Sequence, residues 1–230
     1  MAFGRKSAIP AGKLFVVRIK TKDEDDKELL PAVFQISQKD EATAKWTKID
    51  KTEQTISGDL FKVEIGKGEW DGKPYKTVKL YLNDSDLNEN YLIDLRYMSL
   101  SRNLFNALLN LKTYKGISVS LYKSKGKPKD GQPAKEYSNI SVWQNDQLIK
   151  TKYKSDEMPK ADEITNKKGE VIQRDYTELN DFLENELKTL AENVSAAAKN
   201  KTTSVAKAAV SEVENESVPD TELPEDTVLF

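Results

Sequence analysis

An alternation of apolar and polar residues over positions 59–83 is the feature that most constrains the fold. A turn signal, Asp71-Gly72, divides this stretch into two halves. The apolar residues are Phe61, Val63 and Ile65 in the first half, and Val78, Leu80 and Leu82 in the second. A period of two is that of a strand with one buried face, and Asp-Gly favours a tight hairpin turn. We therefore predict a β-hairpin over these residues.

The elements that follow predict a mainly β domain. Residues 101–114 carry leucines and a phenylalanine at helical spacing, and Ser99 or Ser101 can cap that helix. Strands are predicted at residues 91–98, 117–123, 137–143 and 147–153. The predicted chain order is three strands, a helix and two strands. This is the chain order of an OB fold, a small Greek-key barrel whose helix plugs the open end of the barrel. A helix-plugged barrel of another topology, or a sheet with one packed helix, gives a similar order.

Four regions are predicted along the chain. Residues 1–12 form a flexible arm, and residues 13–153 form the OB-fold-like domain, with extra strands at its N-terminal end. Residues 154–194 supply a polar connection and an amphipathic helix packed on the barrel. Residues 195–230 form a low-complexity linker and a disordered acidic tail, and the linker part, residues 195–210, is compatible with a frayed helix as well.

Composition excludes several kinds of chemistry. The chain contains neither cysteine nor histidine, so disulfides, thiol nucleophiles, imidazole acid–base catalysis and zinc sites with the usual ligands are all excluded. We expect no cofactor, no metal and no enzymatic activity. There is no apolar run of about 18 residues and no apolar core of signal-peptide length near the N-terminus. We therefore expect a cytoplasmic protein that makes no contact with a membrane.

The charge is divided unevenly along the chain. Residues 211–230 contain seven acidic residues and no basic one. Since the whole chain carries −2 and this tail contributes −7, residues 1–210 carry +5. Most of the basic residues are lysines, which act as mobile point charges, whereas arginine suits bidentate recognition. The body is thus suited to loose contact with phosphates rather than to reading base edges.

Aromatic and basic side chains are predicted on the outward faces of the strands and on two loops. Exposed aromatic rings among lysines suit base stacking, and flexible lysines neutralise phosphates. The alternative is that the rings pack under other elements and that the lysines belong to an ordinary solvated loop. The candidate DNA-binding residues are Trp70, Lys73, Tyr75, Lys79, Tyr81, Tyr122, Lys123, Lys125, Lys127, Lys129, Tyr137 and Trp143.

An acidic segment, residues 83–90, offers a competing hypothesis. Its first positions match a calcium loop, but Glu89 stands at the required glycine position and Leu95 at that of the bidentate glutamate. A metal-dependent nuclease using Asp84, Asp86 and Asp94 is the remaining form of this hypothesis. It predicts that the three carboxylates converge in one cleft.

The acidic tail ends in an apolar tip, Val228-Leu229-Phe230. Acidic residues alone are typical of a solubilising tail, but a terminal phenylalanine has no solubilising effect. It suits an anchor in the pocket of a partner protein, with nearby acids meeting basic residues. The candidate partner-binding residues are Glu222, Glu225, Asp226, Leu229 and Phe230.

A β-barrel with aromatic and lysine-rich elements, followed by an acidic tail ending in phenylalanine, resembles single-stranded DNA-binding proteins of the bacteriophage type. The resemblance covers residues 14–153 and 211–230 and implies sequence-independent coating of single strands in DNA replication, recombination and repair. It also implies a tail that recruits a polymerase, primase or helicase. Bacterial tails end in Ile-Pro-Phe, whereas this one ends in Thr-Val-Leu-Phe, which favours phage-encoded partners. The alternative is a non-enzymatic interaction or virion protein whose outward aromatics are covered by other elements.

Overall fold

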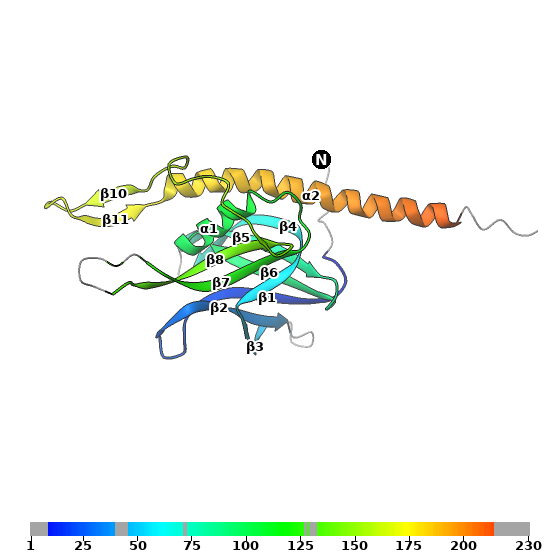
Figure 1. Ribbon diagram of the computed structural model, residues 1–230, viewed down its shortest axis with the longest axis horizontal. Coiled ribbons are helices and arrows are strands. Elements are labelled where there is room, and N and C mark those ends of the chain that lie inside the picture. The colour runs from blue at the N-terminus through cyan, green and yellow to red at the C-terminus, as the bar shows by residue number, and fades with distance from the viewer. Residues whose placement is uncertain (1–8, 40–45, 71–72, 127, 129–132, 214–230) are drawn as a thin grey trace, which may run out of the picture.

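The computed structural model describes residues 9–39, 46–70, 73–126, 128 and 133–213. These residues form a mainly β protein with a long helix lying along one side of a curved sheet (Figure 1). The strands are β1 (Lys13–Lys22), β2 (Glu28–Lys39), β3 (Trp46–Glu53), β4 (Thr55–Trp70), β5 (Lys73–Asp84), β6 (Glu89–Arg96), β7 (Ile117–Lys125), β8 (Glu136–Gln144), β9 (Gln147–Leu148), β10 (Asp162–Thr165) and β11 (Val171–Asp175). The helices are α1 (Ser99–Leu108) and α2 (Thr177–Val213).

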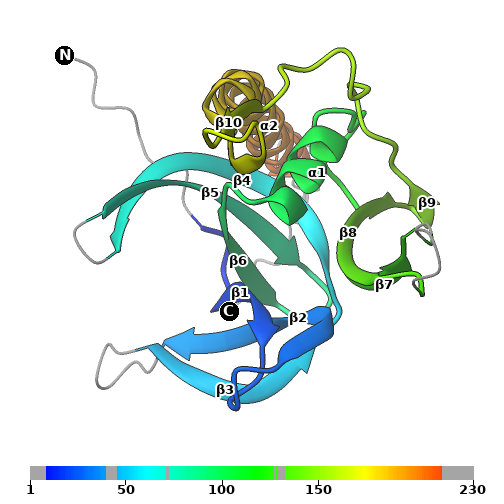
Figure 2. The ribbon, with the colours of Figure 1, turned by 90° about the vertical axis from the view of Figure 1, so that its left-hand side faces the viewer.

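One mixed sheet, in the order β3-β2-β1-β6-β5-β4-β7-β8-β9, contains nine of these strands. Strand β4 belongs to both halves of this sheet, because its first residues, Thr55–Gly58, pair with β7 and the rest pairs with β5. The sheet therefore turns at β4, and β7 and β8 lie across the core from β5 and β6 (Figure 2). The predicted chain order of three strands, a helix and two strands is confirmed.

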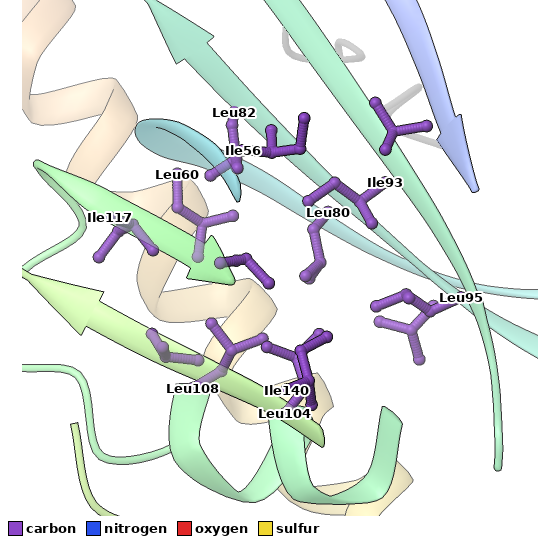
Figure 3. Close-up of a cluster of buried hydrophobic side chains, with 14 of the residues drawn as sticks. Ile56, Leu60, Leu80, Leu82, Ile93, Leu95, Leu104, Leu108, Ile117 and Ile140 are labelled. Atoms are coloured by element: carbon purple, nitrogen blue, oxygen red, sulfur yellow. The ribbon is translucent and has the colours of Figure 1, made fainter. Parts of the chain in front are cut away.

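The core lies between the two halves of the sheet and beneath α1. Figure 3 shows its side chains converging from β4, β5, β6, β7, β8 and α1. Most residues that alternation predicted to face inward are buried; they include Val63, Val78, Leu80, Leu82, Ile93, Leu95, Ile117, Val119, Leu121, Ile140 and Val142. Phe61 is the exception: the register of β4 shifts between Leu60 and Lys62, and the ring packs beside Tyr81 instead. Each large aliphatic side chain buried in this way contributes about 1.5–3 kcal/mol.

Helix α1 fills the end of the core, as its apolar spacing predicts. Leu104 and Phe105 are fully buried, and the Phe105 ring packs edge-on against Tyr97 with centroids 5.1 Å apart. The Ser101 hydroxyl accepts a hydrogen bond of 2.9 Å from the Met98 N–H, so this serine satisfies an amide at the start of the helix. Asn106 then fixes the segment after β9, because its amide donates to the Tyr153 carbonyl oxygen over 2.9 Å.

The mainly β architecture of the predicted OB-fold-like barrel is confirmed, but the sheet runs from β3 to β9 without closing into a barrel. The edge of β6 that a closed barrel would use pairs instead with β1, in parallel. Strands β1 and β2 therefore lie between β6 and β8. Strand β2 reaches β8 through a side chain, with the Ala32 N–H donating to the Ser138 hydroxyl over 2.9 Å.

Helix α2 covers the side of β4 and β5 that faces away from β3. It buries Leu183, Leu187, Leu190 and Val194, and Lys76 of β5 forms ion pairs with its Asp181 and Glu184 at 2.5 and 2.7 Å. The backbone stays helical through residues 195–210, the stretch that composition left open between a frayed helix and a linker. Strands β10 and β11 form a separate exposed ribbon before it.

Candidate nucleic-acid interface

The outward side chains of β4, β5, β6, β1, β2 and β3 share one face of the curved sheet. Figure 2 shows the sheet curving from the β4–β5 hairpin at one border to the β2–β3 hairpin at the other, and these side chains lie on the face turned away from the core. Strand register places two rows of side chains across it. One row is Lys62, Tyr81, Leu92, Val16, Ser37 and Lys48; the next is Glu64, Lys79, Asp94, Arg18, Gln35 and Thr52. We call this surface the concave face.

Tyr81 lies within the concave face but is not the exposed ring that alternation predicted. It is only 8% exposed, because the Lys62 ammonium lies over its ring at 4.9 Å and Phe61 packs beside it with centroids 6.0 Å apart. Its hydroxyl donates to Glu64 over 2.7 Å. The prediction that Tyr81 is an exposed ring is therefore wrong, since neighbouring side chains cover it and leave little of it open to a base.

Lys62, Glu64 and Tyr81 form a neutral unit at neutral pH. Burial and the hydrogen bond to Glu64 raise the pKa of the Tyr81 phenol, which therefore stays protonated. Partial burial alone would raise the pKa of Glu64, but hydrogen bonds from Lys62 and Tyr81 outweigh it and hold that pKa below its ordinary value. The Lys62 ammonium pairs with the carboxylate at 2.5 Å, so the positive field of this face arises from other residues.

The other cations are Arg18, Lys48 and Lys79 within these two rows and Lys20 and Arg96 just beyond them, and the one further acid in the two rows is Asp94. Asp94 accepts a hydrogen bond of 2.6 Å from the Thr77 hydroxyl and lies 3.8 Å from Arg18. The Arg18 side chain is still 73% exposed. A surplus of exposed cations on a concave surface concentrates field lines and attracts polyanions.

Tyr75 lies at one end of the concave face in contact with Arg96. The guanidinium of Arg96 lies 4.2 Å from the centroid of the Tyr75 ring. On β4, Gly68 is directly opposite Tyr75, and a side chain at that position would overlap the ring. The glycine therefore lets the tyrosine ring lie against the strand. The result is a cation–π contact between a guanidinium and an aromatic ring, two groups that can each stack on a nucleobase.

The predicted residues of β7 and β8 do not join this surface. Tyr122, Tyr137 and Trp143 are exposed, at 46, 47 and 37%. However, the inward residues of both β5 and β7 face the same core, so their outward residues point in opposite directions. Figure 2 shows β7 and β8 on the far side of the molecule from the β4–β5 hairpin. The structure therefore divides the single groove expected from the sequence into two separate faces.

The predicted basic loop after β7 is described only in part. Lys123 forms an ion pair with Glu136 at 2.8 Å, so its charge is already matched, whereas Lys125 is exposed. Lys127, Lys129 and the tail residues Glu222, Glu225, Asp226, Leu229 and Phe230 lie outside the described residues. The side chains of Trp70 and Lys73 also lie outside them; these residues pair at the end of the β4–β5 hairpin.

The carboxylates of the nuclease hypothesis do not converge. Asp84 pairs with Glu89 at one end of the β5–β6 ladder, whereas Asp94 pairs with Lys79 five residues further along, a separation of about 17 Å at the usual rise per residue. Asp84 instead accepts hydrogen bonds from the Asp86 and Leu87 amides, both at 3.1 Å. Among the residues that the structure describes, no group of acidic side chains is arranged to hold a metal ion.

Sequence reasoning missed the contributions of β1, β3 and β6, namely Arg18, Lys20, Lys48 and Arg96. A signal for two of them was present: in residues 14–20, Val16, Arg18 and Lys20 alternate with Phe15, Val17 and Ile19. That period places both cations on one face of a strand. It does not say which neighbouring strand this face joins, because the β1–β6 pairing is non-local.

Comparisons with protein-family models, with curated proteins and with solved structures found no match to this chain. Within the described part of the chain, neither helix has the length and apolar character needed to cross a membrane. The functional assignment therefore rests on the geometry and charge of the concave face.

Proposed function

We propose that this protein binds single-stranded DNA without sequence preference and without enzymatic activity. The observation that carries the proposal is the concave face, on which cations from separate strands, all at least partly exposed, share one surface with an arginine–tyrosine contact at its end. Single strands are bound by this combination of a basic groove and stacking surfaces. The rival hypothesis of an interaction protein predicts that the outward aromatics are covered; Tyr81 is covered, whereas Tyr122, Tyr137 and Trp143, on the separate face of β7 and β8, are exposed.

The strand connections support an OB-like domain with an altered closure. Strands β4, β5 and β6 form an antiparallel meander, α1 follows, β7 and β8 form a hairpin, and β7 returns to pair with β4. These are the connections of the five-stranded OB fold. In a closed barrel β6 would pair directly with β8, and we infer that β1 and β2 stand between these two strands instead. We also infer that the β2–β3 hairpin borders the DNA-binding surface, a position that the β7–β8 loop has in an OB fold.

Each part of the concave face has a distinct role in this proposal. Lys20, Lys48, Lys79 and Arg18 contact phosphates, which gives affinity without sequence information. The Arg96–Tyr75 stack receives a base, and stacking of this kind is worth about 1–3 kcal/mol per base. The Lys62–Glu64–Tyr81 unit keeps the floor of the groove rigid and neutral. A protein of this kind acts in DNA replication, recombination and repair, in the cytoplasm of a host cell if it is encoded by a phage.

Anisotropy of fluorescently labelled oligo-dT tests the proposal. We expect saturable binding at low salt, with log affinity falling linearly against log salt by about 0.7 per phosphate neutralised. A duplex of the same length should bind more weakly, and the oligonucleotide should stay intact with added magnesium. Absence of binding at low salt, or an affinity independent of salt, would refute the proposal; cleavage would favour a nuclease.

Removal of residues 211–230 should tighten the binding of oligo-dT. These residues carry seven acids and no base, and a tethered polyanion competes with DNA for exposed cations. The increase in affinity for oligo-dT should be largest at low salt, and it should disappear at high salt, which screens the competing charges. A matched control replaces the seven acids by Asn or Gln while leaving the three-residue apolar tip in place. Unchanged or weaker binding of both variants at low salt would argue against the competition.

A further inference from the structure

A small cavity lies on the core side of the sheet, near the residues at which β6 begins. Its volume is about 220 Å³, roughly that of seven water molecules at about 30 Å³ each. Helix α1 covers the other end of β6, where Phe105 packs against Tyr97, so the two ends of the core are built differently. We call this space the β6-end cavity. Its described lining residues are Phe15, Ile36, Gln38, Ile49, Glu89 and Tyr91.

Aromatic and aliphatic side chains form most of the wall of the β6-end cavity. The rings of Phe15 and Tyr91, on the paired strands β1 and β6, stack with centroids 5.7 Å apart and planes 25° from parallel. Ile36 of β2 is buried, and Ile49 of β3 is partly buried against the same core. Because aromatic rings favour offset stacking on one another, a wall of this kind suits a flat apolar group.

One carboxylate, that of Glu89, is fixed at the wall of this cavity by the Tyr91 hydroxyl, which donates a hydrogen bond to it. Burial and this hydrogen bond raise the pKa of the Tyr91 phenol, and the charges of Glu89, Asp84 and Glu53 raise it further. The phenol therefore remains a donor at neutral pH. An ionised carboxylate has about four lone-pair sites, so Glu89 can accept further hydrogen bonds from a ligand.

The charge around the β6-end cavity is negative. Besides Glu89 itself, Asp84 and Glu53 lie close enough to act on the Tyr91 phenol. Lys13 is opposite Glu89 in the β1–β6 ladder, but its side chain is exposed. Within the described part of the chain, Glu89 forms no ion pair with a cation. A carboxylate beside apolar walls and without a cation favours a positively charged ligand.

We propose that the β6-end cavity binds a small aromatic amine, with its ammonium group paired to Glu89 and its ring packed on Phe15 and Tyr91. The faces of these rings also attract a nearby cation. Drug-sized ligands occupy cavities of about 300 Å³ or more, so this smaller space suits one ring with a short chain. The inference does not rest on the proposed function, because Phe15 and Tyr91 lie on the opposite face of the sheet from the concave face.

Titration of the isotope-labelled protein with phenethylamine tests this inference, with backbone amide chemical shifts as the readout. The amides of Ile36, Glu89 and Tyr91 should shift saturably, with a dissociation constant of about 0.1–1 mM for a ligand of this size. Phenethyl alcohol retains the ring without the charge, and butylamine retains the charge without the ring. Each should bind at least about tenfold more weakly, since it lacks one of the two interactions. Phenylacetate should not bind, because Glu89 repels its carboxylate.

Glu89→Gln should weaken the binding of phenethylamine by about tenfold or more, since it removes the charge and leaves an oxygen for the Tyr91 hydroxyl. Glu24→Gln is the matched control. It removes one negative charge from an exposed turn beyond the far end of β1, about 30 Å from Phe15 at the usual rise per residue, and should bind phenethylamine normally. Ile49→Phe should weaken binding by a similar factor with Glu89 intact, because the larger side chain fills the cavity.

Four results would overturn the inference. They are absence of saturable shifts up to about 20 mM phenethylamine, equal binding of phenethyl alcohol, equal losses in Glu89→Gln and Glu24→Gln, and no loss in Ile49→Phe. Equal binding of butylamine would also overturn it and would assign the cavity to a lysine side chain. Oligo-dT should bind Glu89→Gln within about twofold of the unmodified chain, which shows that this variant is folded. Loss of DNA binding and loss of amine binding are thus measured separately.

Discussion

Replacing Lys20 and Lys79 together by glutamate should weaken the binding of oligo-dT by about 100-fold at moderate salt. Both side chains belong to the concave face, on strands β1 and β5 with β6 between them. Reversing one phosphate contact is worth about tenfold, or 1.4 kcal/mol, and contacts this far apart add approximately. The dependence of log affinity on log salt should also become shallower by about 1.4, the value for two phosphates on a single strand.

A control must change net charge equally without touching the concave face. Lys112→Glu with Lys150→Glu serves this purpose, since both residues are exposed and lie beyond α1 and β9. This pair should bind oligo-dT within about twofold of the unmodified chain, because distant surface charges are screened. Equal losses in the two double variants would show that binding depends on overall charge and not on the concave face. A loss confined to the control would place the DNA on another surface.

Phe105→Ala should destabilise the protein by about 3–5 kcal/mol. The ring is fully buried in α1 and packs against Tyr97, so its removal combines lost burial with a cavity that the surrounding sheet cannot close. The free energy of unfolding in urea measures this change. A cost below about 1 kcal/mol would mean that α1 is not part of the cooperative core.

Tyr97→Phe is the matched control for this prediction. It retains the aromatic ring and removes only a hydroxyl, which is buried and has no hydrogen-bond partner among the described residues. A buried hydroxyl without a partner is destabilising, so its removal should leave the unfolding free energy unchanged or raise it by about 1 kcal/mol. A large loss from Tyr97→Phe would instead reveal a partner for that hydroxyl.

For each strand taken alone, the sequence predicted which side chains of the candidate site point outward. Lys79 lies on the face opposite Val78 and Leu80, as alternation predicts, because neighbouring residues of any strand point to opposite faces. Exposure of Tyr122, Tyr137 and Trp143 followed from the same rule. Tyr81 shows its limit: the rule places the ring on the outward face, but Lys62 and Phe61 cover it there.

The sequence by itself determined the local elements: the period of two in β4, β5, β7 and β8, and the helical spacing of Leu104, Phe105 and Leu108 in α1. These follow from interactions between residues close in the chain. Only the tertiary structure decided which outward faces share a surface. The parallel pairing of β1 with β6 places Arg18 and Lys20 on the same face as Lys79, with β6 between them, and the turn of the sheet at β4 directs Trp143 away from them. Such pairings join segments 59 or more residues apart, and they depend on how the whole core packs, which no local period encodes.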